Sequence, residues 1–133
     1  MSHENVEFIE RLLRDAQRDA TVLFENLHDE VVWELASVEI PDIPSRSHGP
    51  DGVREFFRRW VSTFEEWGFE PVEIIDAGDS VVVHMHQWGR GKGSGASVEG
   101  YFWQVWKLRG GKVIRNTHYL DKAEALEAAG IRE

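Results

Sequence analysis

The feature that most constrains the fold is the segment GYFWQVWKLRGGKVIRNTHYL, which occupies residues 100–120. Two stretches with the apolar pattern of β-strands, Gly100 to Leu108 and Lys112 to Leu120, flank an Arg-Gly-Gly turn. This arrangement predicts a long antiparallel hairpin. Each strand would span roughly 30 Å at ~3.3 Å per residue, which is long for a chain of 133 residues. A sheet built on this hairpin therefore has to curve.

The register of the hairpin depends on the length of its turn. If the two glycines form a two-residue loop, Leu108 faces Val113 and Trp106 faces Arg115, which places a charge among large apolar groups. If the preceding arginine joins the loop and the second glycine is left-handed, the register shifts by one residue. We expect this three-residue loop. It pairs Leu108 with Lys112, Trp106 with Ile114, Gln104 with Asn116 and Phe102 with His118.

The expected register gives the hairpin two contrasting faces. The inner face mixes apolar walls with three polar groups, and it consists of Phe102, Gln104, Trp106, Leu108, Ile114, Asn116, His118 and Leu120. The outer face consists of Tyr101, Trp103, Val105, Lys107, Val113, Arg115, Thr117 and Tyr119. Because this outer face is too aromatic for ordinary solvated surface, we expect it to contact a partner, most simply a second copy of the chain.

Composition narrows the class of protein. The length of 133 residues predicts a single domain over residues 1–133, and six Trp and seven Phe can build a core that lines a cavity. The chain has no Cys, so disulfides and thiolate metal sites make no contribution. The net charge of −9 opposes binding to nucleic acid. The amino-terminal MSHENVEF lacks an apolar run and no stretch approaches a membrane span, so we expect a cytoplasmic protein with no membrane partner.

Apolar spacing predicts the order of elements in the rest of the chain. Helices are expected at residues 5–17, 20–27, 50–67 and 121–129, and strands at 31–35, 69–76 and 80–87. Residues 36–49 are expected to form a long loop of the kind that often rims a site. The third helix carries a broad aromatic stripe and ends at Gly68. These elements predict an α+β fold with helices on the concave face of a strongly curved, mostly antiparallel sheet.

Three segments, taken with this order of elements, carry a family resemblance. They are Val31-Val32-Trp33 after Leu27-His28-Asp29, the stretch from His48 to Phe56, and Gly111-Lys112-Val113-Ile114 continuing to Tyr119-Leu120-Asp121. Nearly the whole chain resembles the SnoaL-like branch of the NTF2-like superfamily. The resemblance implies a cone-shaped fold with one pocket. Members of this superfamily include polyketide cyclases, ketosteroid isomerases, limonene-epoxide hydrolases, scytalone dehydratase and non-enzymatic binding modules, so it implies the fold more than the activity.

The resemblance also indicates pocket positions. Polyketide cyclases of this branch line the pocket with a Gln and a His on one strand and a His and a catalytic Asp on the next. Gln104 and His118 match this pattern, whereas Trp106 and Leu120 stand at the first His and the Asp. In the ketosteroid isomerases the Asp that donates to the substrate oxygen falls at Gln104, and the general base falls near Leu35. Neither leucine can take a proton.

His118, with Gln104 and Asn116, is the best candidate for catalysis. A neutral imidazole near pH 7 can move a proton while two amides orient a carbonyl oxygen. The alternative is that the same groups line a ligand cavity without catalysis. The residues expected to contact the substrate are Trp33, Phe57, Trp60, Met85, Phe102, Trp106 and Leu120, of which the two tryptophans at 33 and 60 follow from the resemblance.

We therefore expect a cofactor-free pocket protein that binds a small hydrophobic, ring-containing carbonyl compound and forms a homodimer through the outer sheet face. If it is an enzyme, the reaction is an isomerisation, cyclisation or dehydration by proton transfer. The alternative is a non-catalytic ligand-binding or dimerisation module, which the leucines at the two acidic positions favour.

Two further motifs invite other interpretations. His84 and His86 share a strand face, the spacing of a metal pair, but no third ligand is evident. We expect them on the outer face, as interface or surface residues, and we expect no metal site. The glycines from Gly89 to Gly95 superficially resemble a phosphate cradle, but they lie between two strands. A flexible hairpin tip is the expected structure.

Overall fold

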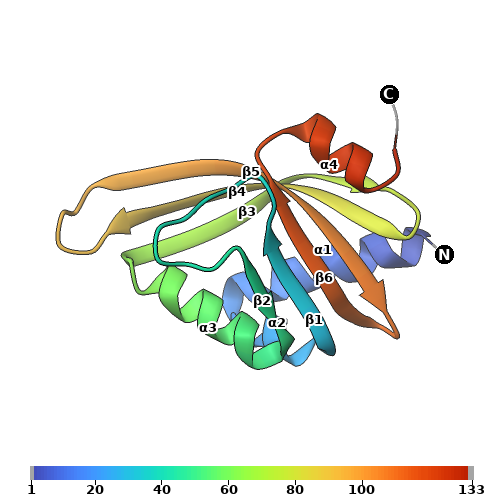
Figure 1. Cartoon of the computed structure of the whole chain (residues 1–133), viewed down its shortest axis with the longest axis horizontal. Coiled ribbons are helices and arrows are strands. Elements are labelled where there is room, and N and C mark those ends of the chain that lie inside the picture. Colours follow the sequence, from blue (N-terminus) through green and yellow to red (C-terminus); the bar gives the residue numbers. More distant parts are fainter. Residues whose placement is uncertain (1, 132–133) are drawn as a thin grey trace.

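One curved sheet organises the computed structural model, which describes residues 2–131 (Figure 1). The elements are α1 (Ser2–Arg18), α2 (Thr21–Glu25), β1 (Leu27–Leu35), β2 (Arg46–His48), α3 (Gly49–Val61), β3 (Phe64–Asp76), β4 (Ser80–Gly91), β5 (Ser97–Arg109), β6 (Lys112–Tyr119) and α4 (Lys122–Ala128). The strand order is β2-β1-β6-β5-β4-β3, with β1 and β6 parallel and every other pair antiparallel. The predicted α+β class with a mostly antiparallel, curved sheet is confirmed.

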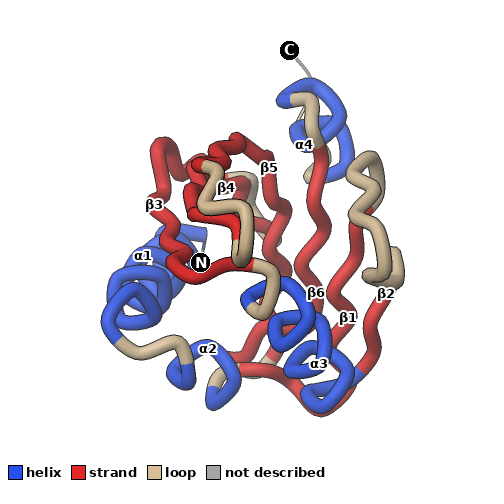
Figure 2. Tube along the Cα trace, turned by 90° about the vertical axis from the view of Figure 1, so that its left-hand side faces the viewer, coloured by secondary structure: helices blue, strands red, loops and turns tan. Residues whose placement is uncertain are grey.

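Helices α1, α2 and α3 cover one face of the sheet, and α4 covers part of the other (Figure 2). The main core joins α1 and α3 to inward side chains of the sheet such as Val81, Val83 and Trp106. Val82, between two of these inward residues, packs instead with Leu126 of α4. Alternate residues of a strand thus pack against the helices on opposite faces of the sheet, and α4 is the one described helix on the outer face.

The hairpin turn differs from the expected three-residue loop. Gly110 and Gly111 form the turn, with φ of +58° and +75°, and Arg109 pairs with Lys112. Two consecutive residues with positive φ match the twist of a two-residue hairpin turn, and two glycines adopt it without strain.

A β-bulge then shifts the register of the hairpin. Leu108 pairs with Val113 but Lys107 pairs with Arg115, which leaves Ile114 as the extra residue on β6. Beyond the bulge the pairs are Trp106–Asn116, Gln104–His118 and Trp103–Tyr119. The expected pairing was wrong, yet Gln104, Trp106, Asn116 and His118 still lie on the inner face. Val113, which we expected on the outer face, is fully buried in the main core.

The aromatic stripe predicted on one helix is divided between two elements. Helix α3 ends at Val61, because the hydroxyls of Ser62 and Thr63 donate to the carbonyls of Arg59 (2.9 Å) and Trp60 (2.7 Å). Phe64, Trp67 and Gly68 therefore lie on β3, and the prediction of a helix to residue 67 was wrong. The ring of Phe64 still packs edge to face on Trp60, 5.0 Å between centroids. Aromatic residues fit a half-buried strand as well as a helix, and their spacing does not distinguish the two.

Smaller differences extend the strands. Strand β1 begins at Leu27 rather than Val31, because Leu27 pairs with Val113 and the Val113 N–H donates to the Asn26 carbonyl at 2.8 Å. The expected loop over 36–49 contains the short strand β2, which pairs with β1. No helix of residues 2–131 is long and apolar enough to cross a membrane.

Close packing on β4 generates a stability prediction. A Cβ at Gly89 would lie 2.7 Å from the Glu66 carbonyl oxygen and 2.8 Å from the Phe64 ring. Because a strand backbone cannot move aside, we expect Gly89→Ala to lower the free energy of unfolding by about 2 kcal/mol. Gly100→Ala is the matched control, since a Cβ there meets only the Phe102 ring at 3.4 Å. Equal urea midpoints for the two variants would contradict this packing.

Candidate functional site

The inner face of the sheet and the three helices above it enclose a cavity of about 480 Å³. This volume is typical of sites for small organic ligands. Every layer contributes to its wall, which is lined by Leu13, Ala16, Ala20, Leu23, Phe24, Trp33, Leu35, Val38, Ile40, Arg54, Phe56, Phe57, Arg58, Trp60, Val61, Trp67, Phe69, Met85, Gln87, Phe102, Gln104, Trp106 and His118. No Asp or Glu belongs to this lining. The wall is thus mainly apolar and offers no carboxylate as a general base.

A chain of hydrogen bonds runs along the buried floor of the cavity. Trp106 Nε1–H donates to Gln104 Oε1 at 2.9 Å, which fixes the orientation of the amide. Gln104 Nε2 then donates to His118 Nε2 at 3.0 Å. Since His118 Nε2 accepts, its proton is on Nδ1, which donates to the Glu34 carbonyl at 3.3 Å. The chain links β5, β6 and β1 and occupies both nitrogens of the imidazole.

Burial keeps His118 neutral. Its side chain is deep in the protein, and desolvation lowers its pKa from 6.5 to about 4, against a smaller opposing effect of the hydrogen bond to Glu34. At neutral pH the ring is therefore uncharged. A base with this pKa accepts a proton weakly near pH 7, and its Nε2 lone pair already accepts a hydrogen bond from Gln104.

Trp33 stands at the centre of the aromatic lining. Its ring lies 5.3 Å from Phe57, 5.5 Å from Trp106 and 5.9 Å from His118, measured between centroids. The contacts with Phe57 and Trp106 are edge to face, a favourable arrangement of aromatic quadrupoles. Trp33 therefore contacts both α3, through Phe57, and the hydrogen-bonded chain on the floor, through Trp106 and His118.

The opposite end of the cavity is rimmed by exposed residues. Ala20, Arg54, Arg58 and Val61 belong to the lining and are exposed, so the mouth lies between α3 and the segment that precedes α2. The Arg54 guanidinium lies over the Phe24 ring, 5.8 Å from its centroid. The cavity opens to solvent past these side chains.

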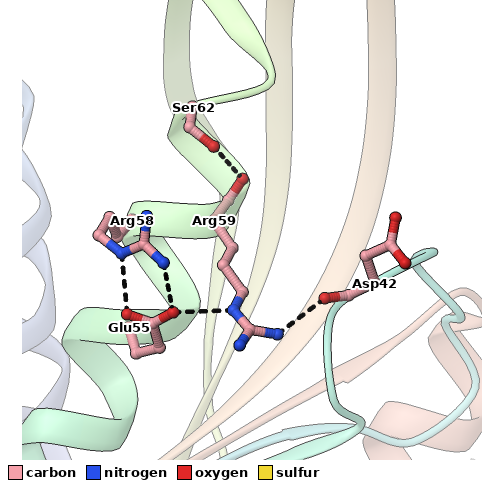
Figure 3. A network of polar contacts seen from close by, with 5 residues as sticks. All are labelled: Asp42, Glu55, Arg58, Arg59 and Ser62. Carbon is pink, nitrogen blue, oxygen red and sulfur yellow. Dashed lines mark hydrogen bonds and ion pairs between the residues drawn. The ribbon is translucent and has the colours of Figure 1, made fainter.

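A polar network fixes one wall (Figure 3). Glu55 accepts hydrogen bonds from Arg58 at 2.8 and 2.6 Å and from Arg59 at 2.8 Å. These bonds, those from Arg58 first, lower the pKa of Glu55 to about 2. Arg59 also donates to the Asp42 carbonyl at 3.0 Å. Because the loop 36–45 contributes two lining side chains, this network holds the loop over the cavity.

Most predicted site residues line this one cavity. They are Trp33, Phe57, Trp60, Met85, Phe102, Gln104, Trp106 and His118. Asn116 and Leu120 do not belong to the lining. Leu120 is 58% exposed, because β6 ends at Tyr119 and the Leu120 N–H donates to Ser37 Oγ at 2.9 Å. The expectation that Leu120 lines the pocket was wrong.

The side chain of Asn116 is fully buried and makes no hydrogen bond with the described residues. Neither its Nδ2 nor its Oδ1 has a hydrogen-bond partner in the part of the chain that the structure describes. It pairs in register with Trp106 on one side and with Trp33 on the other. It thus lies on the inner face beside the floor, without forming part of the lining.

Sequence reasoning missed the part of the lining that comes from helices and the long loop. Leu13 and Ala16 of α1, Leu23 and Phe24 of α2, and Val38 and Ile40 of the loop were not expected there. Amphipathic spacing identified the buried side of α1 but does not separate residues that pack on the sheet from residues that border a void.

A smaller cavity of about 150 Å³ adjoins the first toward the β4–β5 hairpin. The two share Trp60, Trp67, Gln87 and Phe102 in their linings. The smaller cavity lies along β4 and β5, and its lining, unlike that of the larger one, includes a carboxylate, Glu99.

The histidine pair lies on the outer face, as expected. His84 stacks on Trp103 with 4.1 Å between centroids, and His86 stacks on Tyr101 at 4.5 Å. His86 also lies 3.1 Å from a Glu99 carboxylate oxygen. Within residues 2–131, no group of three or more His, Asp or Glu side chains is arranged to hold a metal ion.

Comparisons with known proteins place this fold. A family model described as the SnoaL-like domain matches residues 7–116. Among proteins with curated functions, none matches significantly. Solved structures with the same fold include TerC co-crystallised with polyporic acid, which is 23% identical with a TM-score of 0.74 over 95% of this chain and 98% of that one.

Two further structures extend the comparison. A candidate SnoaL-like polyketide cyclase from Jannaschia sp. CCS1 is 20% identical, with a TM-score of 0.72 over 98% of this chain and 94% of that one. A protein from Catenulispora acidiphila DSM 44928 has a ketosteroid isomerase-like fold and was solved with trimethylamine. It is 13% identical, with a TM-score of 0.70 over 95% and 94% of the two chains. At these identities the likeness establishes the fold.

The buried imidazole predicts acid sensitivity. The folded pKa of His118 is about 4 against 6.5 in the unfolded chain, so the unfolded state takes up the proton first as the pH falls. The stabilisation is complete above pH 6.5, and up to about 3 kcal/mol is lost as the pH falls to 4. We expect His118→Gln, which keeps a neutral polar group near Nε2, to abolish this loss. Urea unfolding at pH 7.5, 5.5 and 4 tests it, and a wild type and variant with parallel pH profiles would contradict it.

Proposed function

The chain belongs to the SnoaL-like domain family, and from that premise we propose that it binds a hydrophobic, ring-containing carbonyl compound in its cavity. The size of the cavity and its aromatic lining carry this proposal. Trp33 and Phe57, which contact each other edge to face with 5.3 Å between centroids, present apolar ring surfaces against which a flat ligand ring can pack. The crystallisation of TerC, a protein of the same fold, with polyporic acid is consistent with a ligand of this kind.

The polar chain on the floor supports a carbonyl group in the ligand. Gln104 uses its carbonyl oxygen on Trp106 and one amide hydrogen on His118. The amide carries a second hydrogen, which can donate to an oxygen in the cavity. A ligand that supplies such an acceptor gains a hydrogen bond in a water-poor site, where an unmatched polar group is costly.

We propose binding without proton transfer by His118. The low pKa of His118, its two occupied nitrogens and the absence of Asp and Glu from the lining together leave no competent base in the cavity. Leu35, at the position of the isomerase base, is itself part of the apolar wall. Turnover of a bound ketone that His118→Gln removes would contradict this non-catalytic assignment.

Filling the cavity tests the proposal. Ala16 lies on α1, is 7% exposed and belongs to the lining. We expect Ala16→Phe to occupy the cavity, to preserve the fold and to weaken binding of 9-fluorenone at least ~10-fold, a loss of about 1.4 kcal/mol. Ala128→Phe, on the exposed side of α4, is the control and should bind like the wild type.

Binding is read from the melting temperature and from tryptophan fluorescence. Fluorenone at one hundred times its dissociation constant should add about 2.7 kcal/mol of stability, a shift of several degrees. If neither fluorenone, polyporic acid nor a steroid ketone binds the wild type, the proposed function is wrong.

We further propose that the chain forms a homodimer through its outer sheet face. An outer patch of His84, His86, Trp88 and Tyr101 leaves two large aromatic rings exposed, Trp88 by 41% and Tyr101 by 50%. Helix α4 packs on Trp103 and Val105 instead. A second copy placed on the patch would bury these rings.

Oligomeric state tests the dimer. We expect Tyr101→Arg to convert the dimer into a monomer, because an interface with two-fold symmetry would oppose two copies of the new charge. Leu120→Arg, which changes another exposed apolar residue outside the patch, should leave the dimer intact. Light scattering after size-exclusion chromatography distinguishes the two. A wild type that is monomeric at high micromolar concentration would refute the dimer.

A further inference from the structure

The Trp33 side chain lines the cavity and carries a buried hydrogen-bond donor without a partner. Its side chain is 2% exposed and belongs to the lining, yet its Nε1–H has no partner among residues 2–131. Trp106, equally buried at 2%, donates its own N–H to Gln104. A buried donor without an acceptor costs on the order of 1–3 kcal/mol, so such groups are uncommon in folded proteins.

The acceptors of the hydrogen-bonded chain beside Trp33 are already occupied. The His118 ring, 5.9 Å away between centroids, accepts from Gln104 at one nitrogen and donates to a backbone carbonyl from the other. The Gln104 oxygen accepts from Trp106, whose ring lies 5.5 Å from that of Trp33. The acceptors of the hydrogen-bonded chain are therefore not available to the Trp33 N–H.

Asn116 adds to this imbalance. It lies opposite Trp33 in the register of β1 and β6, it is fully buried, and both of its amide atoms are also unpaired. Two neighbouring positions on paired strands thus hold unsatisfied polar groups without bonding each other. Stability alone would favour apolar residues here, because a matched apolar pair avoids the desolvation cost.

We infer that the Trp33 indole N–H is the specificity-determining donor of the site, which binds the acceptor oxygen of a ring ketone or quinone. This inference rests on the proposed function and adds to it the group that selects a carbonyl over a hydrocarbon of the same shape. Ring contacts place Trp33 beside Trp106 and His118, the two hydrogen-bond partners of Gln104. The unpaired donor lowers the stability of the empty protein and is satisfied on binding.

The first test compares a ketone with its hydrocarbon. Dissociation constants of 9-fluorenone and fluorene, which have the same ring skeleton, are measured for the wild type, Trp33→Phe and Phe57→Leu. We expect the wild type to prefer the ketone by about fivefold to tenfold, as for one hydrogen bond. Trp33→Phe should remove most of that preference. Phe57→Leu, at a lining aromatic residue 5.3 Å from Trp33, should weaken both ligands and keep their ratio.

The second test observes the donor itself in the wild type. In protein labelled with ¹⁵N-tryptophan, the Trp33 indole proton is assigned by its loss in Trp33→Phe. Fluorenone should move that proton downfield and slow its exchange with solvent, whereas fluorene should not. Only the wild type is titrated with the two compounds, so the result does not depend on how well Trp33→Phe folds or binds.

The outcomes separate the two proposals. A ketone preference that persists in Trp33→Phe, or an indole proton that responds alike to both compounds, overturns the role of Trp33 and leaves the ligand-binding function standing. Equal binding of ketone and hydrocarbon by the wild type also overturns it. Failure of every ring compound to bind refutes the proposed function, and the role of Trp33 with it.

Discussion

The hydrogen-bonded chain from Trp106 through Gln104 and His118 to the Glu34 carbonyl is the interaction on which the site depends. It joins three adjacent strands at the point where the sheet changes from antiparallel to parallel pairing. A polar group buried this deeply is costly without a partner, and because each group of the chain is the partner of the next, the chain behaves as a unit. It fixes the amide orientation and the imidazole tautomer, and with them the polarity of the floor. The apolar walls then determine shape, and the floor determines chemistry.

Much of the fold could be predicted because its strongest signals are local. The long hairpin and its two glycines follow from alternation and turn chemistry. The inward and outward faces of the hairpin were predicted correctly beyond the bulge, although the register was wrong. The turn is one residue shorter than expected and the bulge at Ile114 adds one residue, so Gln104 and His118 face inward in both the expected and the observed pairing. Val113, which lies before the bulge, does not benefit from this cancellation and is buried instead of exposed. The aromatic stripe failed for a different reason, since Phe64 and Trp67 suit either a helix or a strand, and only the hydroxyl contacts of Ser62 and Thr63 end the helix.

Most of the lining residues that could be predicted from the sequence lie on strands. Residues on β1, β4, β5 and β6 were identified because side-chain direction on a strand follows from position. Lining residues such as Leu13 and Val38 come from packing between distant segments, which no local pattern records. Leu120 was misplaced because the apolar pattern extends the strand to residue 120, while the chain leaves β6 one residue earlier. The unpaired Trp33 N–H also has no sequence signal, since it depends on how neighbouring acceptors are already used.

The single parallel pair in the sheet has a consequence for how the protein folds. Strands β3 to β6 form successive antiparallel neighbours, and such local pairings form early because little loop entropy is lost. Strand β1 has to wait for β6, as the Glu34–His118 contact joins residues 84 apart in sequence. The cavity floor is therefore closed by the most non-local strand pairing of the sheet, β1 with β6, and a folding intermediate that lacks it would expose the aromatic lining. We expect the site to be the last part of the molecule to assemble and the first to open.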